Sequence, residues 1–119
     1  MKLVNPEELK EKLENEKSLV MYFSTQWCGP CKTLSPIVEN VSKEFTTEVI
    51  KIDLGVYPEL ANEFNVKSVP TIVYLKNKNE MLRTIGLQPE EKIKENFKLV
   101  KTISQDELSA AQIASDEHE

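Results

Sequence analysis

The sequence of 119 residues has one histidine, two cysteines and three glycines, and it has no long apolar run. Its longest wholly apolar segments, Leu19–Phe23 and Ile72–Leu75, are far shorter than the roughly 20 residues that span a bilayer. The first 20 residues carry nine charged side chains, so the apolar core of a secretory signal does not fit among them. We therefore expect a cytoplasmic protein that does not enter membranes.

Basic residues are in no excess either. The formal net charge of −5 comes from 15 Lys and Arg against 20 Asp and Glu. The first 103 positions hold 15 residues of each sign, so the whole acidic excess lies in the last 16 residues. A neutral body with an acidic tail has no electrostatic footprint for nucleic acid or for an anionic membrane. We expect neither as a partner, and we expect a monomer.

The scarcity of histidine and cysteine also restricts the chemistry of Cys28 and Cys31. A structural zinc site needs four ligands, and the single histidine, His118, lies next to the C-terminus, so we predict no metal site within one chain. A disulfide between residues three apart closes almost no loop and would stabilise the fold little. Besides a redox role, two interpretations stay open: two buried apolar side chains, or half of a ligand set shared between chains.

Apolar periodicity predicts eight elements in the order α-β-α-β-α-β-β-α. The predicted helices open at Asn5-Pro6, run from Gly29 and Pro30 to Phe45, and cover Pro58–Phe64 and Pro89–Val100. The predicted strands are Ser18–Phe23, Glu48–Leu54, Thr71–Leu75 and Glu80–Gly86. Pro36 should kink the long helix, because proline lacks the amide hydrogen and crowds the preceding turn.

These elements predict an α/β fold with a central four-stranded mixed β-sheet flanked by helices on both faces. The βαβ portion implies a parallel pair of strands, and the polar turn at Asn77–Asn79 implies an antiparallel hairpin. One domain is expected over residues 1–103. Residues 104–119 form an acidic tail, for which a short helix capped at Ser104–Glu107 and a frayed segment are equally compatible with the sequence. Truncation after Ile103 should leave the activity nearly intact.

Cys28 and Cys31 flank Gly29-Pro30 directly after a predicted strand, at the start of the long helix. A helix N-terminus offers unpaired N–H groups and the positive end of the helix dipole, which favour a thiolate over a thiol. The thiolate is the nucleophile in thiol–disulfide exchange, so Cys28 is expected to attack and Cys31 to resolve. Gly29 allows a tight turn, and Pro30 presets the helical backbone angle.

The segment Trp27-Cys28-Gly29-Pro30-Cys31-Lys32 resembles the active site of the thioredoxin family. The similarity runs from about residue 1 to about residue 103 and includes Pro36, Lys51, Asp53, Val69-Pro70-Thr71 and Gly86. It implies the thioredoxin fold and a protein-disulfide reductase that binds no cofactor. It also implies that electrons reach the Cys28–Cys31 disulfide from NADPH through a separate thioredoxin reductase.

The same resemblance assigns further site residues. It makes Trp27, Val69, Pro70 and Gly86 the docking surface for disulfide-containing protein substrates, with the bond before Pro70 in cis and that proline facing the disulfide. It assigns a supporting role in the active site to six residues: Trp27, Gly29, Pro30, Lys32, Lys51 and Pro70. Lys51 interrupts an interior strand, where a buried lysine needs a partner or loses its charge.

Tyr22 departs from the family pattern. A buried aspartate usually stands there, beneath the disulfide and near the lysine that matches Lys51, and it is assigned to proton transfer for the resolving cysteine. Tyrosine can donate a hydrogen bond but is a poor proton acceptor near neutral pH. We hypothesise that resolution by Cys31 is assisted by water and depends more strongly on pH, whereas attack by Cys28 survives.

Two alternative functions stay open. A disulfide isomerase or oxidase of the same fold would use the same cysteines, although Gly29-Pro30 and the charged N-terminal segment favour a reductase. A non-enzymatic binding module would dock a protein while the thiols modulate its affinity. The reduction potential separates the first alternative from a reductase. Complex formation that persists after substitution of both cysteines would indicate the second.

Overall fold

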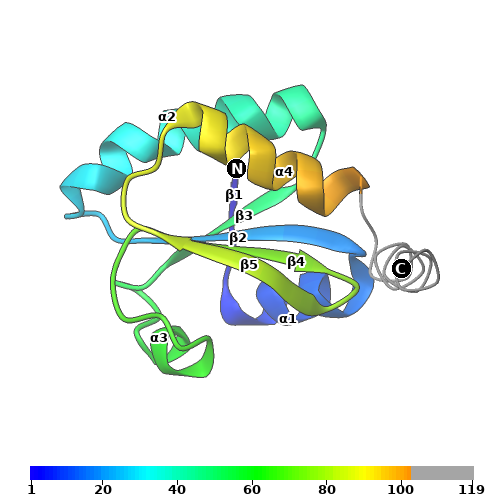
Figure 1. Ribbon diagram of the computed structural model, residues 1–119. Coiled ribbons are helices and arrows are strands. Elements are labelled where there is room, and N and C mark those ends of the chain that lie inside the picture. The colour runs from blue at the N-terminus through cyan, green and yellow to red at the C-terminus, as the bar shows by residue number, and fades with distance from the viewer. Residues whose placement is uncertain (103–119) are drawn as a thin grey trace, which may run out of the picture.

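The computed structural model describes residues 1–102 (Figure 1). Within that range, five strands form one mixed sheet: β1 (Lys2–Leu3), β2 (Ser18–Ser24), β3 (Val49–Asp53), β4 (Thr71–Lys76) and β5 (Asn79–Ile85). The helices are α1 (Pro6–Asn15), α2 (Gly29–Phe45), α3 (Glu59–Glu63) and α4 (Glu90–Thr102). Helices α2 and α4 cover one face of the sheet, and α1 and α3 cover the other. In residues 1–102, no helix has the length and hydropathy needed to span a bilayer.

Strand β2 lies in the middle of the sheet, whose strand order is β1-β3-β2-β4-β5. It pairs in parallel with β3, where Tyr22 is opposite Lys51, and antiparallel with β4, where Phe23 is opposite Thr71. The carboxyl ends of β2 and β3 therefore meet the beginning of β4 at one end of the sheet. At this end the chain passes from β2 into α2.

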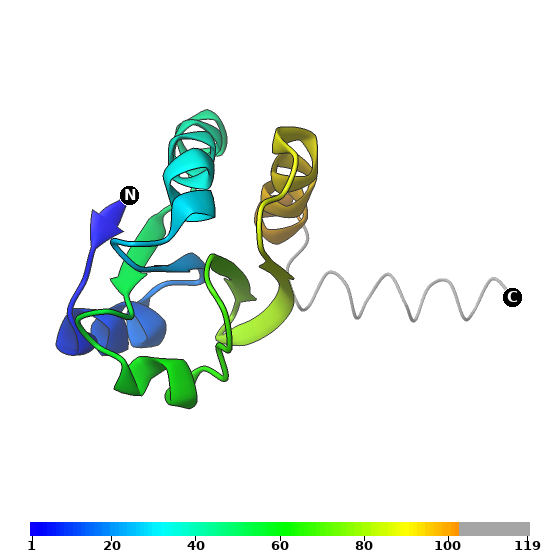
Figure 2. The ribbon, with the colours of Figure 1, turned by 90° about the vertical axis from the view of Figure 1, so that its left-hand side faces the viewer.

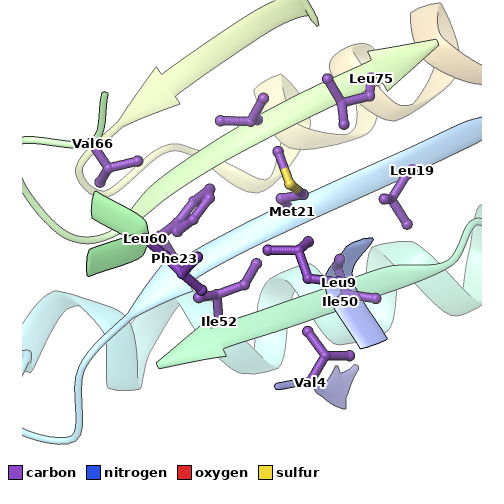
Figure 3. Packing of buried hydrophobic residues seen from close by; sticks show 11 residues of the cluster. Val4, Leu9, Leu19, Met21, Phe23, Ile50, Ile52, Leu60, Val66 and Leu75 are labelled. Carbon is purple, nitrogen blue, oxygen red and sulfur yellow. The ribbon is translucent and has the colours of Figure 1, made fainter. Parts of the chain in front are cut away.

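The continuous apolar run of β2 is buried on both faces, as a central strand requires. Its side chains alternate, so Met21 and Phe23 join the cluster beneath α1 and α3, and Tyr22 joins the cluster beneath α2 and α4. Figure 3 shows the first cluster, in which Ile50 and Ile52 of β3 lie beside the side chains of β2. The sheet thus separates two packed layers of side chains.

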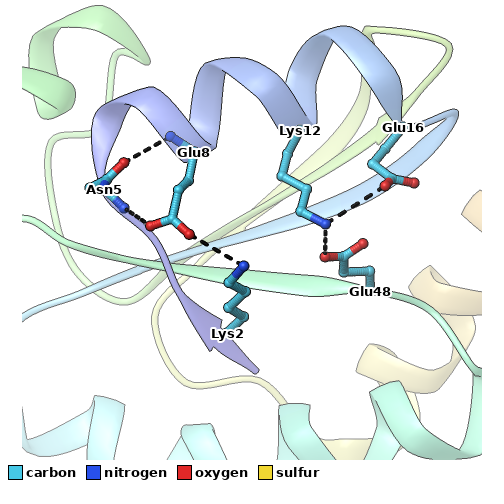
Figure 4. A network of polar contacts seen from close by, with 6 residues as sticks. All are labelled: Lys2, Asn5, Glu8, Lys12, Glu16 and Glu48. Atoms are coloured by element: carbon cyan, nitrogen blue, oxygen red, sulfur yellow. Dashed lines mark hydrogen bonds and ion pairs between the residues drawn. The ribbon is translucent and has the colours of Figure 1, made fainter.

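A capping box fixes the start of α1 (Figure 4). The Asn5 Oδ1 atom accepts a hydrogen bond from the Glu8 amide at 2.8 Å, and the Glu8 carboxylate accepts one from the Asn5 amide at 3.2 Å. An asparagine in this position stabilises a helix by about 1 kcal/mol relative to alanine. The Asn5 amide and the neighbouring Lys2 hold the pKa of Glu8 below its ordinary value. These contacts tie α1 to β1, the strand that precedes it.

The structure confirms the predicted α/β fold, the mixed sheet and the helices on both faces. It adds a fifth strand, β1, to the four that the sequence predicts. This strand has only two residues, Lys2 and Leu3, and is too short to show any periodicity. Pro36 lies inside α2, which continues to Phe45. The capping box and short helix considered for the acidic tail lie outside the described residues.

Candidate active site

Cys28 and Cys31 form a disulfide at the start of α2, and their Cα atoms are 5.2 Å apart. Cys28 is the N-cap residue of the helix, and its Sγ atom accepts a hydrogen bond from the Cys31 amide at 3.1 Å. Both side chains are buried, with 8% of Cys28 and 3% of Cys31 exposed. The pair is a disulfide held at the positive end of a helix dipole.

Four loops of the chain lie at the end of the sheet where α2 begins, which faces the viewer in Figure 2. They lead from β2 into α2, from β3 into α3, from α3 into β4 and from β5 into α4. The second of these loops is tied to the end of β2, because the Leu54 amide donates a hydrogen bond of 2.9 Å to the Ser24 carbonyl. Residues that are distant in the sequence are thereby placed together at one end of the sheet.

Pro70 and Gly86 are connected directly, because the Gly86 amide donates a hydrogen bond to the Pro70 carbonyl at 2.8 Å. The Val69–Pro70 peptide bond is cis, which confirms that sequence-based prediction. Pro70 is buried, and Val69 and Gly86 are half-buried. Gly86 has a φ of 84°, a conformation that glycine adopts readily and other residues rarely do. Val69 and Pro70 thus lie beside Gly86 at the same end of the sheet.

Trp27 precedes the disulfide and is 82% exposed. It is the largest exposed apolar side chain at this end of the sheet. Its indole lies against Gly55, in the loop after β3. A Cβ atom at position 55 would be 3.3 Å from the indole Cζ3 atom and 3.1 Å from Asp53 Oδ1. The same Asp53 oxygen accepts a hydrogen bond from the Gly55 amide at 2.8 Å. The lack of a side chain at Gly55 therefore allows the indole to approach the loop.

We expect Gly55→Ala to displace the Trp27 ring, because the added methyl group would be closer to the indole than most Cβ contacts allow. Trp27 is the only tryptophan, so its fluorescence emission reports the displacement directly. Because the sequence predicts that Trp27 docks protein disulfides, the KM for such a substrate should rise severalfold with kcat nearly unchanged. Gly29→Ala is the fluorescence control, since nothing lies within 4 Å of its added methyl group. Emission from Gly55→Ala that matches the native spectrum would contradict the expectation.

Lys32 and Lys51 occupy different environments. Lys32 is exposed on the first turn of α2. Lys51 is half-buried on β3, directly across from Tyr22. Within residues 1–102 the Lys51 amino group makes no hydrogen bond or ion pair. A half-buried lysine keeps contact with water, so the requirement predicted for a buried lysine does not apply to it.

Tyr22 lies fully buried in β2, on the face of the sheet that α2 covers. Burial raises the pKa of its hydroxyl group above the ordinary value, and a hydrogen bond from Ser35 opposes this shift. The phenol is therefore protonated at the pH at which thiols react. As the sequence indicates, this position provides a hydrogen-bond donor in place of a carboxylate.

Three residues of the site were not predicted as site residues from the sequence: Ser35, Asp53 and Gly55. Asp53 ends the buried strand β3 and Gly55 stands two residues later, which is the spacing of a turn closed by an aspartate side chain. Ser35 stands four residues after Cys31, on the same side of the helix. Neither pattern is specific enough to indicate a function without the structure.

Comparisons with known proteins agree with this geometry. A family model described as Thioredoxin matches residues 1–99. A thioredoxin of Rickettsia felis is 36% identical over 86 residues, which cover 71% of this chain and 82% of that protein. A thioredoxin of Mycoplasmoides gallisepticum is 33% identical over 99 residues, which cover 81% of this chain and 97% of that protein.

Solved structures of the same fold lead to the same result. A mutant thioredoxin from Halobacterium salinarum has a TM-score of 0.79 and 28% sequence identity, over 86% of this chain and 91% of that chain. Chloroplastic thioredoxin z has a TM-score of 0.76 and 30% identity, over 84% and 93% of the two chains. With the family model spanning nearly all of the described residues, the chain belongs to the thioredoxin family of thiol–disulfide oxidoreductases, which reduce protein disulfides.

Proposed function

We propose that Cys28 is the nucleophile of this reductase and that Cys31 is the resolving cysteine. The observation that carries the proposal is the hydrogen bond of 3.1 Å from the Cys31 amide to the Cys28 sulfur at the first turn of α2. After reduction, that N–H group and the helix dipole would stabilise negative charge on the Cys28 sulfur. Cys28 is also the more exposed of the two and follows the exposed Trp27. These features favour attack through Cys28.

The reaction consists of two exchanges of sulfur partners. The Cys28 thiolate attacks one sulfur of the substrate disulfide, and the other substrate sulfur leaves as a thiolate that takes up a proton. Cys31 then loses its proton and attacks the Cys28 sulfur, which releases the second substrate thiolate and forms the Cys28–Cys31 disulfide. Counting the proton that Cys28 loses when its thiolate forms and the proton that the second substrate thiolate takes up, the enzyme loses two electrons and two protons, and the substrate gains them.

The docking surface proposed for protein substrates consists of Trp27, Val69, Pro70 and Gly86. The exposure of Trp27 and the direct bond between Pro70 and Gly86 support this assignment. The residues on either side of Gly86, Ile85 and Leu87, are 59% and 54% exposed and would enlarge the apolar area. Gly29 and Pro30 would shape the turn between the sulfurs. Lys32 and Lys51 would support the site by supplying positive charge near it.

We further propose that a separate thioredoxin reductase returns the enzyme to its dithiol form with electrons from NADPH. The three glycines of the sequence do not form a nucleotide-binding motif, which supports an external source of electrons. The cytoplasm is the compartment proposed for this cycle, because its thiol pool keeps dithiols reduced. Residues 1–103 are proposed as the complete catalytic domain.

A coupled assay tests the cycle. The chain is mixed with NADPH, a thioredoxin reductase and a synthetic peptide that contains one intramolecular disulfide. We expect continuous oxidation of NADPH that depends on the chain, the reductase and the peptide together. Absence of turnover with several reductases, while a chemical dithiol still supports peptide reduction, would contradict the proposed electron donor and leave the cysteine roles intact. The reduction potential measured in parallel separates a reductase from an oxidase or isomerase.

A further inference from the structure

Two polar side chains meet beneath the turn that carries the disulfide. The Tyr22 hydroxyl donates a hydrogen bond to the Cys31 carbonyl oxygen at 3.2 Å. The Ser35 hydroxyl in turn donates to the Tyr22 oxygen at 3.0 Å. Tyr22 is fully buried on the central strand, and Ser35 is half-buried on α2. Ser35, Tyr22 and Cys31 thus form a short hydrogen-bonded chain between β2 and the first turn of α2.

The first turn of α2 makes fewer hydrogen bonds within the helix than a turn in the middle of a helix does. The first N–H groups of any helix have no carbonyl partner within it. Pro36 lies inside α2 and has no amide hydrogen, so the carbonyl of Lys32 receives no helical hydrogen bond from position 36. The segment from Gly29 to Ser35 therefore lacks one of the hydrogen bonds that a helix without proline would have, in addition to those missing at any helix start. The bond from Tyr22 reaches this segment from outside the helix.

The direction of the hydrogen bonds excludes proton transfer to sulfur along this chain. Ser35 donates to Tyr22, and Tyr22 donates to a backbone carbonyl, so the chain ends on oxygen. Burial also raises the pKa of the Tyr22 hydroxyl, which keeps the phenol protonated. The contribution of Tyr22 is therefore geometric, since it holds the backbone of Cys31 against the sheet.

We propose that Tyr22, supported by Ser35, is a positioning residue for the resolving step. In the mixed disulfide, Cys28 is bonded to the substrate, so the Cys28–Cys31 disulfide of the oxidised enzyme is absent. The Cys31 carbonyl is then held to the sheet by Tyr22, which keeps the Cys31 sulfur close to the sulfur that it must attack. Holding a nucleophile in place lowers the entropic part of the barrier. This inference rests on the proposed role of Cys31, and attack by Cys28 does not depend on it.

Tyr22→Phe tests the proposal, because it removes one hydroxyl group and keeps the ring. With the single-disulfide peptide as substrate, rapid acid quenching and mass spectrometry follow the formation and decay of the mixed disulfide. Loss of a hydrogen bond that contributes a net free energy of about 0.5–1.5 kcal/mol should make the lifetime of the mixed disulfide about two- to tenfold longer than in the native chain. The rate of its formation should be unchanged, and so should the midpoint of the pH profile for its decay.

Two further variants complete the test. Tyr74→Phe removes the same atom from another fully buried tyrosine in the same cluster, on β4 against the ring of Phe97, and should change neither rate. Ser35→Ala should lengthen the lifetime less than Tyr22→Phe, and it decides the question if Tyr22→Phe does not fold. A lifetime equal to that of the native chain, an equal slowing of both steps, or a shifted pH midpoint would overturn the proposal. If Cys31→Ser traps no mixed disulfide, the proposed cysteine roles fail instead.

Discussion

In the Cys31→Ser variant, the mixed disulfide between Cys28 and the substrate becomes the major species, whereas in the native chain it is transient. Release of the substrate requires a second sulfur to attack Cys28, and a serine hydroxyl is far too weakly acidic to be present as the anion. The geometry for that attack is built into α2, where the Cα atoms of the two cysteines are 5.2 Å apart. Non-reducing electrophoresis and intact mass measure the adduct with the single-disulfide peptide.

The Cys28→Ser variant is the matched control, since it removes the other sulfur of the same disulfide. It should form no adduct, and its reduction of the peptide should fall to the uncatalysed rate. Accumulation of the mixed disulfide in Cys28→Ser but not in Cys31→Ser would mean that the roles of the two cysteines are reversed. If neither variant forms an adduct and the double variant still binds substrate proteins, the chain is a binding module, which contradicts the proposed exchange.

Phe97→Ala is expected to lower the free energy of unfolding by about 3–5 kcal/mol. Phe97 is fully buried on α4, and its ring lies edge-on to Tyr74 at 5.6 Å and near Phe45 at 6.4 Å. Alanine would leave a cavity where α2, α4 and the sheet meet. Since small domains are stable by about 5–15 kcal/mol, this loss is a large part of the total. Urea unfolding followed by circular dichroism measures it as a lower midpoint at an unchanged m-value.

Leu99→Ala provides the comparison on the same helix. Leu99 is 46% exposed, so its truncation removes less buried surface and leaves no enclosed cavity. We expect a change of less than about 1 kcal/mol. Equal losses for Phe97→Ala and Leu99→Ala would mean that intrinsic helix propensity, and not packing of the α4 face, controls the stability of this region.

The sequence predicts the order and type of the long elements because their apolar patterns are repeated over several turns or residues. The run from Ser18 to Phe23 and the spacing from Leu34 to Phe45 lead to β2 and α2 with ends that agree within one residue. The hairpin between β4 and β5 shows where this reasoning stops. Asn77 and Lys78 adopt positive φ angles of 51° and 68° without any glycine in the turn. Local preferences alone do not predict a lysine in that conformation.

The candidate site could be predicted only in part. The segment around Cys28 carries its chemistry within a few adjacent residues, so its position at a helix start follows from the sequence. The hydrogen bonds of Tyr22 could not be predicted in the same way, because they depend on the register of β2 beneath α2. The contact between Trp27 and Gly55 likewise joins loops that are separated by a helix and a strand. Tertiary packing determines such contacts, and no local pattern encodes them.

The two-residue strand β1 protects the edge of the sheet. Without it, the backbone groups along one side of β3 would be open to pairing with another chain. Lys2 and Leu3 pair with Ile50 and Lys51, and the Val4 amide adds a hydrogen bond of 3.1 Å, so the middle of β3 is covered. β1 itself is too short to serve as a template for further strands.

The opposite edge is protected by different means. On β5, the Arg83 guanidinium binds the Glu80 carboxylate and also reaches the carbonyl groups of Phe64 and Asn65. A register shift between β4 and β5 at Tyr74/Leu75 further interrupts the regular ladder. The docking surface proposed for protein substrates leaves apolar side chains such as Trp27 exposed. With β1 covering one sheet edge, and charged side chains and a register shift on the other, that contact surface can remain open while the risk of edge-to-edge aggregation stays low.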